Sequence, residues 1–361
     1  MPDVHAARRA RLAAILTERE VDAALVTTLV NVRYLTGFTG SNAALLVGAD
    51  GTPLLATDGR YADQSLAEAP DVERVVDRAT LARLVESLPA GTGSVALETH
   101  TLSVDAHASL VDLLEARGAT PARLEQAVEE LRVVKDDTEV DALRRACAIS
   151  VEALAAIHAG PLLGRTEREI ARDLEWRMYG LGAEAIAFDT IVATGPNSAI
   201  PHHQPTDREV RSGDLLKIDF GARVDGYHAD CTRTVVVGRA ADWQREAYDA
   251  VRAAQATGVE AMVAGRPVAE SDAAARAVLD DAGLLEAFTT GIGHGVGLVI
   301  HEDPFIGPKH DGRLLAGTTA TMEPGVYLTG RGGVRIEDTL VVTAGPPDVL
   351  TAATTDLQEL G

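Results

Sequence analysis

One stretch of the chain, residues 214–237, constrains the fold more than any other, because it predicts both a β-hairpin and a pair of neighbouring acids. Its sequence, DLLKIDFGARVDGYHADCTRTVVV, has two apolar, β-rich halves on either side of Asp225-Gly226, a strong signal for a two-residue hairpin turn. Such a turn places Asp230 opposite Gly221. Because side chains alternate between the two faces of a strand, Asp219 and Asp230 become diagonal neighbours on one face.

Two carboxylates at that spacing repel each other, so a bound cation is the simplest explanation for them. A solvated, charged sheet face is the alternative, and this hairpin alone does not decide between the two. Ile218 and Phe220 point to the opposite face of the same strand, where they can be buried.

A second acidic hairpin is predicted in residues 322–338, with the sequence MEPGVYLTGRGGVRIED. A turn within Thr329–Gly332 places Glu323 and Glu337 opposite each other or nearly so, with Arg335 on the same face as Glu337. An exposed charged ladder is again the alternative. It is the weaker explanation here, because the acids stand beside strong β-formers in a largely apolar run.

Residues 291–304, GIGHGVGLVIHEDP, add two histidines, and alternating glycines allow a close backbone approach around the first of them, His294. A lone histidine is more often structural than a ligand, but His294 and His301 share one domain with the four acids. Four carboxylates and one imidazole form a hard, oxygen-rich ligand set that suits Mn²⁺ and related divalent ions. Four negative charges also balance two divalent cations, as in paired-metal hydrolytic sites with ions about 3.5–4 Å apart.

Other catalytic motifs do not fit the sequence. The zinc-binding pattern HExxH would need a histidine where Phe305 stands, and no phosphate-binding P-loop or serine nucleophile elbow occurs. Neither Cys147 nor Cys231 has an evident base nearby in sequence, so a cysteine nucleophile is unsupported.

The composition excludes several classes of function. The 361 residues include 33 Lys plus Arg against 54 Asp plus Glu, for a net charge of −21, and aromatic residues make up 4%. Such a surface repels phosphate backbones and offers few stacking platforms, so we expect neither nucleic acid nor a membrane as a partner. Two separated cysteines and the lack of a long apolar stretch predict a cytoplasmic protein without disulfides.

A change of character near residue 128 predicts two domains. Residues 1–128 alternate short helical and strand-like patterns, as in an α/β domain, and residues 129–361 predict an α+β domain with helices on a mostly antiparallel sheet. Helices are expected at 5–20, 79–88, 137–158, 166–181, 243–264 and 271–282, and strands at 23–28, 43–47, 54–57, 94–97, 188–193, 214–220, 232–237, 320–327 and 333–342.

The ordered motifs D-F-G, D-G-Y, A-D-x-T-R-T, G-H-G-V-G-L, H-E, M-E-P-G-V-Y and V-R-I-E-D resemble the prolidase/aminopeptidase P group of pita-bread metallopeptidases. The resemblance extends to FDTIVATGPNSAIPHH and, in the first domain, to NVRYLTGFTGSNAALL and TDGRY. It is closest to the short bacterial cytoplasmic Xaa-Pro peptidases. It implies a creatinase-like α/β N-terminal domain followed by an α+β pita-bread catalytic domain.

The resemblance also implies a dinuclear metal site that binds Mn²⁺, with Co²⁺ or Zn²⁺ as alternatives. Asp230 and Glu337 would bridge the two ions. The implied ligands are Asp219, Asp230, His294, Glu323 and Glu337.

Further roles follow from the same resemblance. His202 matches a substrate-contacting histidine, although the adjacent His203 departs from the family pattern and leaves open which of the two faces the site. His301 matches a second catalytic histidine, and Arg335 matches an arginine that positions the substrate or the glutamates. Glu323 would double as metal ligand and proton shuttle.

The implied activity is hydrolysis of the bond between an N-terminal residue and a penultimate proline by a metal-activated hydroxide, in a homodimer. That bond is a tertiary amide without an N–H, so peptidases that need a donor there cannot use it. A strict Xaa-Pro dipeptidase is the alternative enzyme, and a non-catalytic peptide-binding pita-bread protein is the alternative from another class. Methionine aminopeptidase shares the ligands, but its relatives normally lack this kind of first domain.

Overall fold

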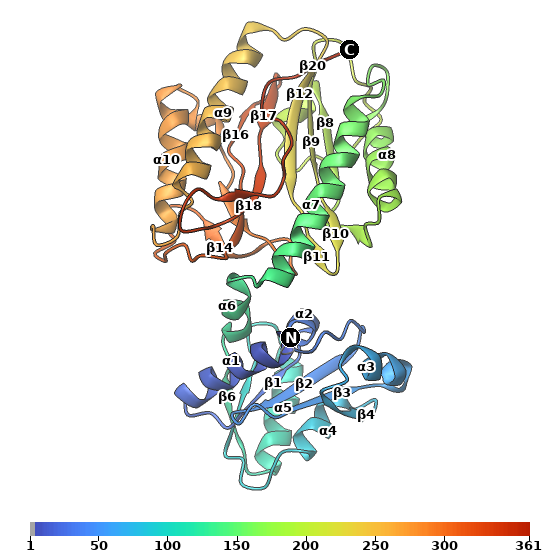
Figure 1. Cartoon of the computed structure of the whole chain (residues 1–361), viewed down its shortest axis with the longest axis vertical. Coiled ribbons are helices and arrows are strands. Elements are labelled where there is room, and N and C mark those ends of the chain that lie inside the picture. Colours follow the sequence, from blue (N-terminus) through green and yellow to red (C-terminus); the bar gives the residue numbers. More distant parts are fainter. Residues whose placement is uncertain (1–3) are drawn as a thin grey trace. The chain divides into compact units, whose positions relative to one another are not determined.

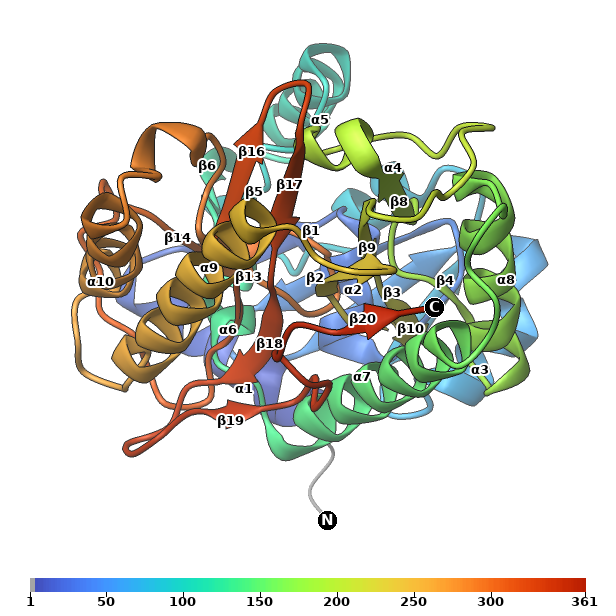
Figure 2. The same ribbon diagram turned by 90° about the horizontal axis from the view of Figure 1, so that it is seen from above.

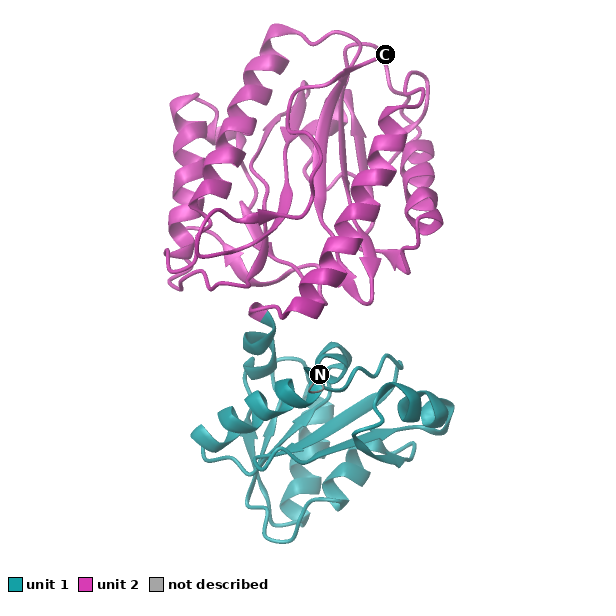
Figure 3. Ribbon diagram, viewed as in Figure 1, with its two compact units in different colours: residues 1–132 teal, residues 133–361 magenta. Residues whose placement is uncertain are grey.

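The structure is a computed structural model in which residues 4–361 are described. The chain forms two compact units that divide between Arg132 and Val133 (Figure 3). The expected boundary lay at residue 128, within the helix α6 (Ala127–Val133) that the structure shows there.

The first unit is built on a six-stranded sheet with the order β4-β3-β2-β1-β5-β6. The strand β1 pairs antiparallel with β2 and parallel with β5, and helices α4 and α5 pack their leucines against the sheet. The elements are α1 (Val4–Glu18), β1 (Ala23–Val26), α2 (Leu29–Thr36), β2 (Ala43–Gly48), β3 (Pro53–Thr57), α3 (Ala62–Glu68), β4 (Glu73–Val76), α4 (Thr80–Glu86), β5 (Ser94–Leu97), α5 (Val104–Ala116) and β6 (Thr120–Arg123).

The second unit begins with two long helices on an antiparallel sheet. Both helices start with a capping box, which satisfies free N–H groups of the first turn. Their apolar faces share a core with the strands β8, β9 and β12. The elements are α7 (Asp137–His158), α8 (Glu167–Gly180), β7 (Ala185–Ile186), β8 (Ile191–Thr194), a 3₁₀ turn (Gly195–Ala199), β9 (Leu215–Phe220), β10 (Ala222–Val224), β11 (Tyr227–His228) and β12 (Cys231–Val237).

The register predicted for the first hairpin is confirmed. Phe220 pairs with Cys231, and Val224 pairs with Tyr227 across the two-residue turn. Asp225 in that turn has φ 48°, the left-handed conformation that a tight hairpin turn requires. Phe220 is fully buried, as its place on the apolar face predicts.

The C-terminal half of the second unit packs α9 and α10 against another set of strands. Figures 1 and 2 show these two helices on the side of the unit opposite to α7 and α8. Their core includes apolar residues of β15, β16, β17 and β18. The elements are α9 (Asp242–Ala261), α10 (Val268–Asp281), β13 (Gly293–Gly295), β14 (Glu302–Ile306), β15 (Thr319–Met322), β16 (Gly325–Leu328), β17 (Gly332–Arg335), β18 (Asp338–Val341), β19 (Asp348–Val349) and β20 (Glu359–Leu360).

The register predicted for the second hairpin is also confirmed, on both sides of its acids. Gly325 pairs with Arg335 in the two-stranded sheet of β16 and β17, and Met322 pairs with Asp338 in the sheet of β15 and β18. Within residues 4–361, no helix is long and apolar enough to cross a membrane.

Candidate functional site

A cavity of about 230 Å³ opens within the second unit. Eight of the nine residues singled out in the sequence line it, and His203 is the exception in the described part of the chain. The lining residues are Phe188, Asp189, Ile191, His202, Gln204, Asp219, Asp230, His294, Ile300, His301, Glu323, Arg335 and Glu337.

The first hairpin brings Asp219 and Asp230 to the cavity through a close backbone contact. Asp219 lies on β9, and Asp230 directly precedes β12. A Cβ on Gly221 would lie 1.8 Å from the carbonyl oxygen of Ala229, so only glycine lets the two chain segments come this close.

The two glutamates lie at the breaks of the second hairpin, where the chain leaves the sheet of β15 and β18 for the two-stranded sheet of β16 and β17 and later returns. Between the β15–β18 and β16–β17 pairs, the backbone N–H of Glu323 donates to the carbonyl oxygen of Ile292 at 2.8 Å. The N–H of Glu337 donates to the carbonyl oxygen of Thr232 at 3.1 Å. The break in the hairpin therefore attaches Glu337 to the first hairpin and Glu323 to the glycine-rich segment.

The imidazole of His294 is oriented as a metal ligand would be. Its Nδ1 lies 3.0 Å from the carbonyl oxygen of Gly295, which can only accept, so Nδ1 carries the proton and Nε2 has a free lone pair. That Nε2 lies 3.5 Å from Asp230 and 3.4 Å from Glu323. One side-chain oxygen or nitrogen atom from each of Asp230, His294 and Glu337 could bind a metal ion, and these atoms all lie within 4.8 Å of one another.

The cluster is electrostatically unfavourable without a cation. Burial, and then the charge of Glu337, raise the pKa of Asp230 well above its usual value. Burial, and then the charge of Glu323, do the same to the pKa of Glu337. Burial raises the pKa of Glu323 to about 7, and burial lowers the pKa of His294 to about 4. The raised pKa values favour the protonated forms of these acids, with which a divalent ion bound here would compete.

Arg335 is the basic side chain that reaches this cluster. It is buried and donates to Oδ2 of Asp219, to the hydroxyl of Thr232 at 2.9 Å and to the hydroxyl of Tyr327 at 3.0 Å. The hydroxyl of Thr232 in turn donates to Glu337 at 2.6 Å. Arg335 thus orients two of the acids, one of them through Thr232.

The other two cavity histidines are solvent-exposed, unlike His294. The ring of His301 lies 4.4 Å from that of His294, edge to face. Partial burial of the ring, and then the neighbouring His202, lower the pKa of His301. His202 and His301 therefore face the same space from different segments, with exposed rings available to a bound molecule.

His203 points away from the cavity. It is buried, and its Nε2 lies 2.8 Å from Oε2 of Glu167 on α8. Of the two neighbouring histidines it is therefore His202 that lines the cavity, and the structure does not bring His203 to the site. Sequence reasoning missed Glu167 and also Lys217, although Lys217 had a signal: it shares the face of Asp219 in the apolar run LLKIDF.

The cysteines take no part in the cavity. Cys147 and Cys231 are buried free thiols, and burial raises the pKa of both. A thiolate nucleophile is therefore disfavoured at either position.

Family models match both units of the chain. The model of Metallopeptidase family M24 matches residues 141–344, and the Creatinase/Prolidase N-terminal domain matches residues 8–134. The Xaa-Pro dipeptidase of Pyrococcus furiosus is 33% identical over 355 residues, which are 97% of this chain and 99% of that protein.

Two solved structures are similar over nearly their whole length. The Xaa-Pro dipeptidase from Bacillus anthracis has a TM-score of 0.94 and 33% identity, covering 99% of this chain and 100% of that one. The X-Pro aminopeptidase from Thermotoga maritima has a TM-score of 0.89 and 33% identity, covering 98% and 99%.

The fold and the buried acids with their histidine define a hydrolytic enzyme of the metallopeptidase class. The chain belongs to Metallopeptidase family M24, and a Creatinase/Prolidase N-terminal domain precedes the catalytic domain in the sequence. The resemblance to the prolidase/aminopeptidase P group and the expected pita-bread fold are thereby confirmed.

Proposed function

We propose that this metallopeptidase cleaves the bond between an N-terminal residue and a following proline. The observation that carries the proposal is the cavity itself, in which five acids, three histidines and one arginine converge. Relatives over nearly the full chain are named Xaa-Pro dipeptidase and X-Pro aminopeptidase, which supports this substrate class.

Asp219, Asp230, His294, Glu323 and Glu337 would hold two divalent ions, with Mn²⁺ as our choice. The donor set fits, because Oδ1 of Asp219 is buried without a hydrogen-bond partner among residues 4–361. His294 also directs an unprotonated nitrogen at two of the acids. Oxygen-rich sets of this kind suit Mn²⁺. When bound, such ions acidify water toward neutral pH and polarise a carbonyl.

The remaining steps belong to the chain's own side chains. Glu323 takes a proton from the attacking water and passes it to the proline nitrogen, which has no hydrogen of its own. His202 and His301 donate hydrogen bonds to the oxygen on which negative charge develops. Arg335 holds Asp219 in place, and the free α-amine of the substrate binds near the acids, which makes the activity exopeptidic.

The test separates the two enzyme alternatives. Metal-stripped protein is reloaded with Mn²⁺ and given Ala-Pro and Ala-Pro-Ala, and mass spectrometry identifies the products. Metal-dependent release of alanine and Pro-Ala from the tripeptide supports an aminopeptidase, and cleavage of Ala-Pro alone supports a strict dipeptidase. If neither peptide is cut by metal-loaded protein, the proposal is overturned in favour of a peptide-binding module.

Two finer points complete the proposal. Reloading in parallel with Co²⁺ or Zn²⁺, followed by elemental analysis, tests the choice of Mn²⁺ and the count of two ions per chain. Sedimentation equilibrium tests the expected homodimer, which a monomer mass would contradict.

A further inference from the structure

His202 lies in an irregular segment, residues 200–206, which we call the His202 loop. We propose that Glu167 and Lys217 are positioning residues that fix this loop, and so direct His202 into the cavity. The inference rests on the proposed function, because it gives His202 a role in that reaction. Neither residue is among those that line the cavity in the described part of the chain.

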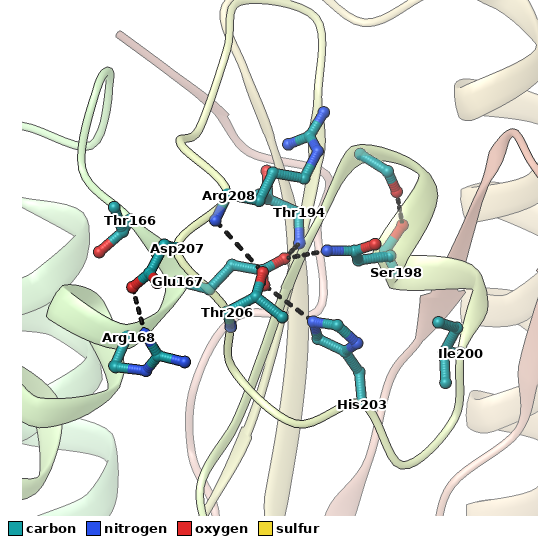
Figure 4. A network of polar contacts seen from close by, with 12 residues as sticks. Thr166, Glu167, Arg168, Thr194, Ser198, Ile200, His203, Thr206, Asp207 and Arg208 are labelled. Atoms are coloured by element: carbon teal, nitrogen blue, oxygen red, sulfur yellow. Dashed lines mark hydrogen bonds and ion pairs between the residues drawn. The ribbon is translucent and has the colours of Figure 1, made fainter.

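Glu167 attaches the His202 loop to the first turn of α8. Its carboxylate is fully buried and accepts five hydrogen bonds (Figure 4). The donors are the backbone N–H of Thr194 at 2.8 Å, the amide of Asn197 at 2.9 Å, Nε2 of His203 at 2.8 Å, and the N–H and hydroxyl of Thr206 at 2.9 and 2.6 Å. One buried carboxylate thus forms hydrogen bonds with the segment before the His202 loop, with the middle of the loop at His203 and with the end of the loop at Thr206.

The hydrogen bond between His203 and Glu167 also restricts the orientation of the adjacent His202. The buried ring of His203 donates to Glu167, whereas the exposed ring of His202 lines the cavity. Two adjacent side chains that point apart share one short piece of backbone. Fixing the buried one therefore limits where the exposed one can be.

Lys217 fixes the other end of the loop. Its Nζ donates to the carbonyl oxygen of Ile200 at 2.7 Å and to that of Pro201 at 3.1 Å, and it lies 5.1 Å from the ring centre of Tyr327. The side chain is fully buried. Because Lys217 and Asp219 share one face of β9, a single strand carries both a candidate metal ligand and the anchor of the loop.

The two anchors matter because the side chain of His202 is itself exposed. Catalytic groups must keep their geometry within about 0.5 Å, and a misplacement of about 1 Å can cost roughly 100-fold in rate. The position of the His202 side chain in the cavity therefore depends on Glu167 and Lys217, which do not line the cavity.

A double-mutant cycle tests the inference. His203→Leu and Lys217→Met are each made in the wild type and in a His202→Ala background, and kcat and KM are measured on Ala-Pro and Ala-Pro-Ala. In the wild type we expect kcat/KM to fall about 10- to 100-fold, mainly through kcat. In the His202→Ala background we expect little further loss, because the anchored side chain is already gone.

Conservative and distant variants serve as controls. His203→Gln keeps a donor near the position of Nε2 and should recover most of the lost activity. His158→Leu, at the end of α7, should leave kcat/KM unchanged. Metal content by elemental analysis should stay at the wild-type level in all these variants, because no ligand is altered.

Hydrogen–deuterium exchange gives a readout that does not depend on activity. Amides of residues 200–206 should exchange faster in His203→Leu and in Lys217→Met than in His158→Leu, with or without Mn²⁺. If the wild type cuts neither peptide, the proposed function fails and this comparison alone decides the inference.

Three results would overturn the inference. Equal losses of kcat/KM in both backgrounds would mean that the anchors act independently of His202. Unchanged exchange in the loop would mean that the anchors do not fix it. Full activity of His202→Ala would remove His202 from catalysis and the positioning role with it.

Discussion

The guanidinium of Arg335 donates to one carboxylate oxygen of Asp219, and the other oxygen of Asp219 is buried without a partner among residues 4–361. Arg335 lies on β17 and Asp219 on β9, so two hairpins far apart in the sequence meet at this pair. The pair leaves one oxygen of Asp219 available to a cation while part of the acidic cluster is neutralised.

Replacement of Arg335 by Met is expected to destabilise the protein by about 3–5 kcal/mol, because it leaves a buried carboxylate without its ion-pair partner. The free energy of unfolding in urea measures this. Arg331→Met, on the exposed turn of the same hairpin and stacked on Trp243, should cost far less. Equal losses for the two variants would contradict the importance of the buried pair.

Glu337 makes a specific pH dependence testable in metal-free protein. Its pKa is raised in the folded state, so above about pH 4.5 the unfolded chain releases a proton that the folded protein retains. The wild type therefore loses stability relative to Glu337→Gln as pH rises. The Tm of Glu337→Gln minus the Tm of the wild type should increase from pH 5 to pH 8.

This comparison cancels titrating groups that do not interact with Glu337, such as Lys217, whose pKa is lowered by burial to about 6. Gln keeps an oxygen that can accept from Thr232. Glu260→Gln on α9 reports the effect of removing an exposed negative charge. A constant or shrinking difference between wild type and Glu337→Gln would show that Glu337 does not gain its raised pKa from the fold.

The same variant separates stability from function. Glu337→Gln should lose at least about 100-fold in kcat/KM, since changes to the outer partners of metal ligands already cost roughly 10–100-fold. Added Mn²⁺ should raise the Tm of the wild type at pH 8 by mass action but have little effect on the variant. Elemental analysis should find less metal in the variant, and undiminished metal content would rule out Glu337 as a ligand.

Gly221 tests the close contact that brings Asp219 and Asp230 together. Gly221→Ala is expected to destabilise the protein by about 3 kcal/mol, because the new methyl group overlaps the carbonyl oxygen of Ala229. Gly180→Ala in the last turn of α8 is the matched control, since a Cβ there meets no other atom within 4 Å. Urea unfolding of both variants should show a loss for the first and none for the second.

Local patterns in the sequence were sufficient for the hairpins and the long helices. The turn at Asp225 set the pairing of β9 with β12, and the symmetry of Glu323 and Glu337 set the pairing of β15–β16 with β17–β18. The helix expected over 137–158 is α7 with the same bounds. Side-chain periodicity and turn chemistry act over a few residues, so they can be read directly from the sequence.

Short or weakly patterned elements were not predicted. The helices α2 and α5 were missed because their residues acquire a buried face only through packing in the first unit. The edge strands β4 and β6 were missed because they have no fully buried residues and so give no clear apolar pattern. The expected strand over 320–327 is in fact two strands in different sheets, divided at Glu323.

The residue pattern of the sequence was therefore enough to select the candidate ligands. It did not predict the contacts that position the other residues of the site. Which of His202 and His203 faces the cavity depends on Glu167, which lies 36 residues from His203 in the sequence. The anchoring of Pro201 by Lys217 depends likewise on how two distant segments pack. Such contacts form only when the chain folds and buried polar groups find partners, which no local pattern encodes.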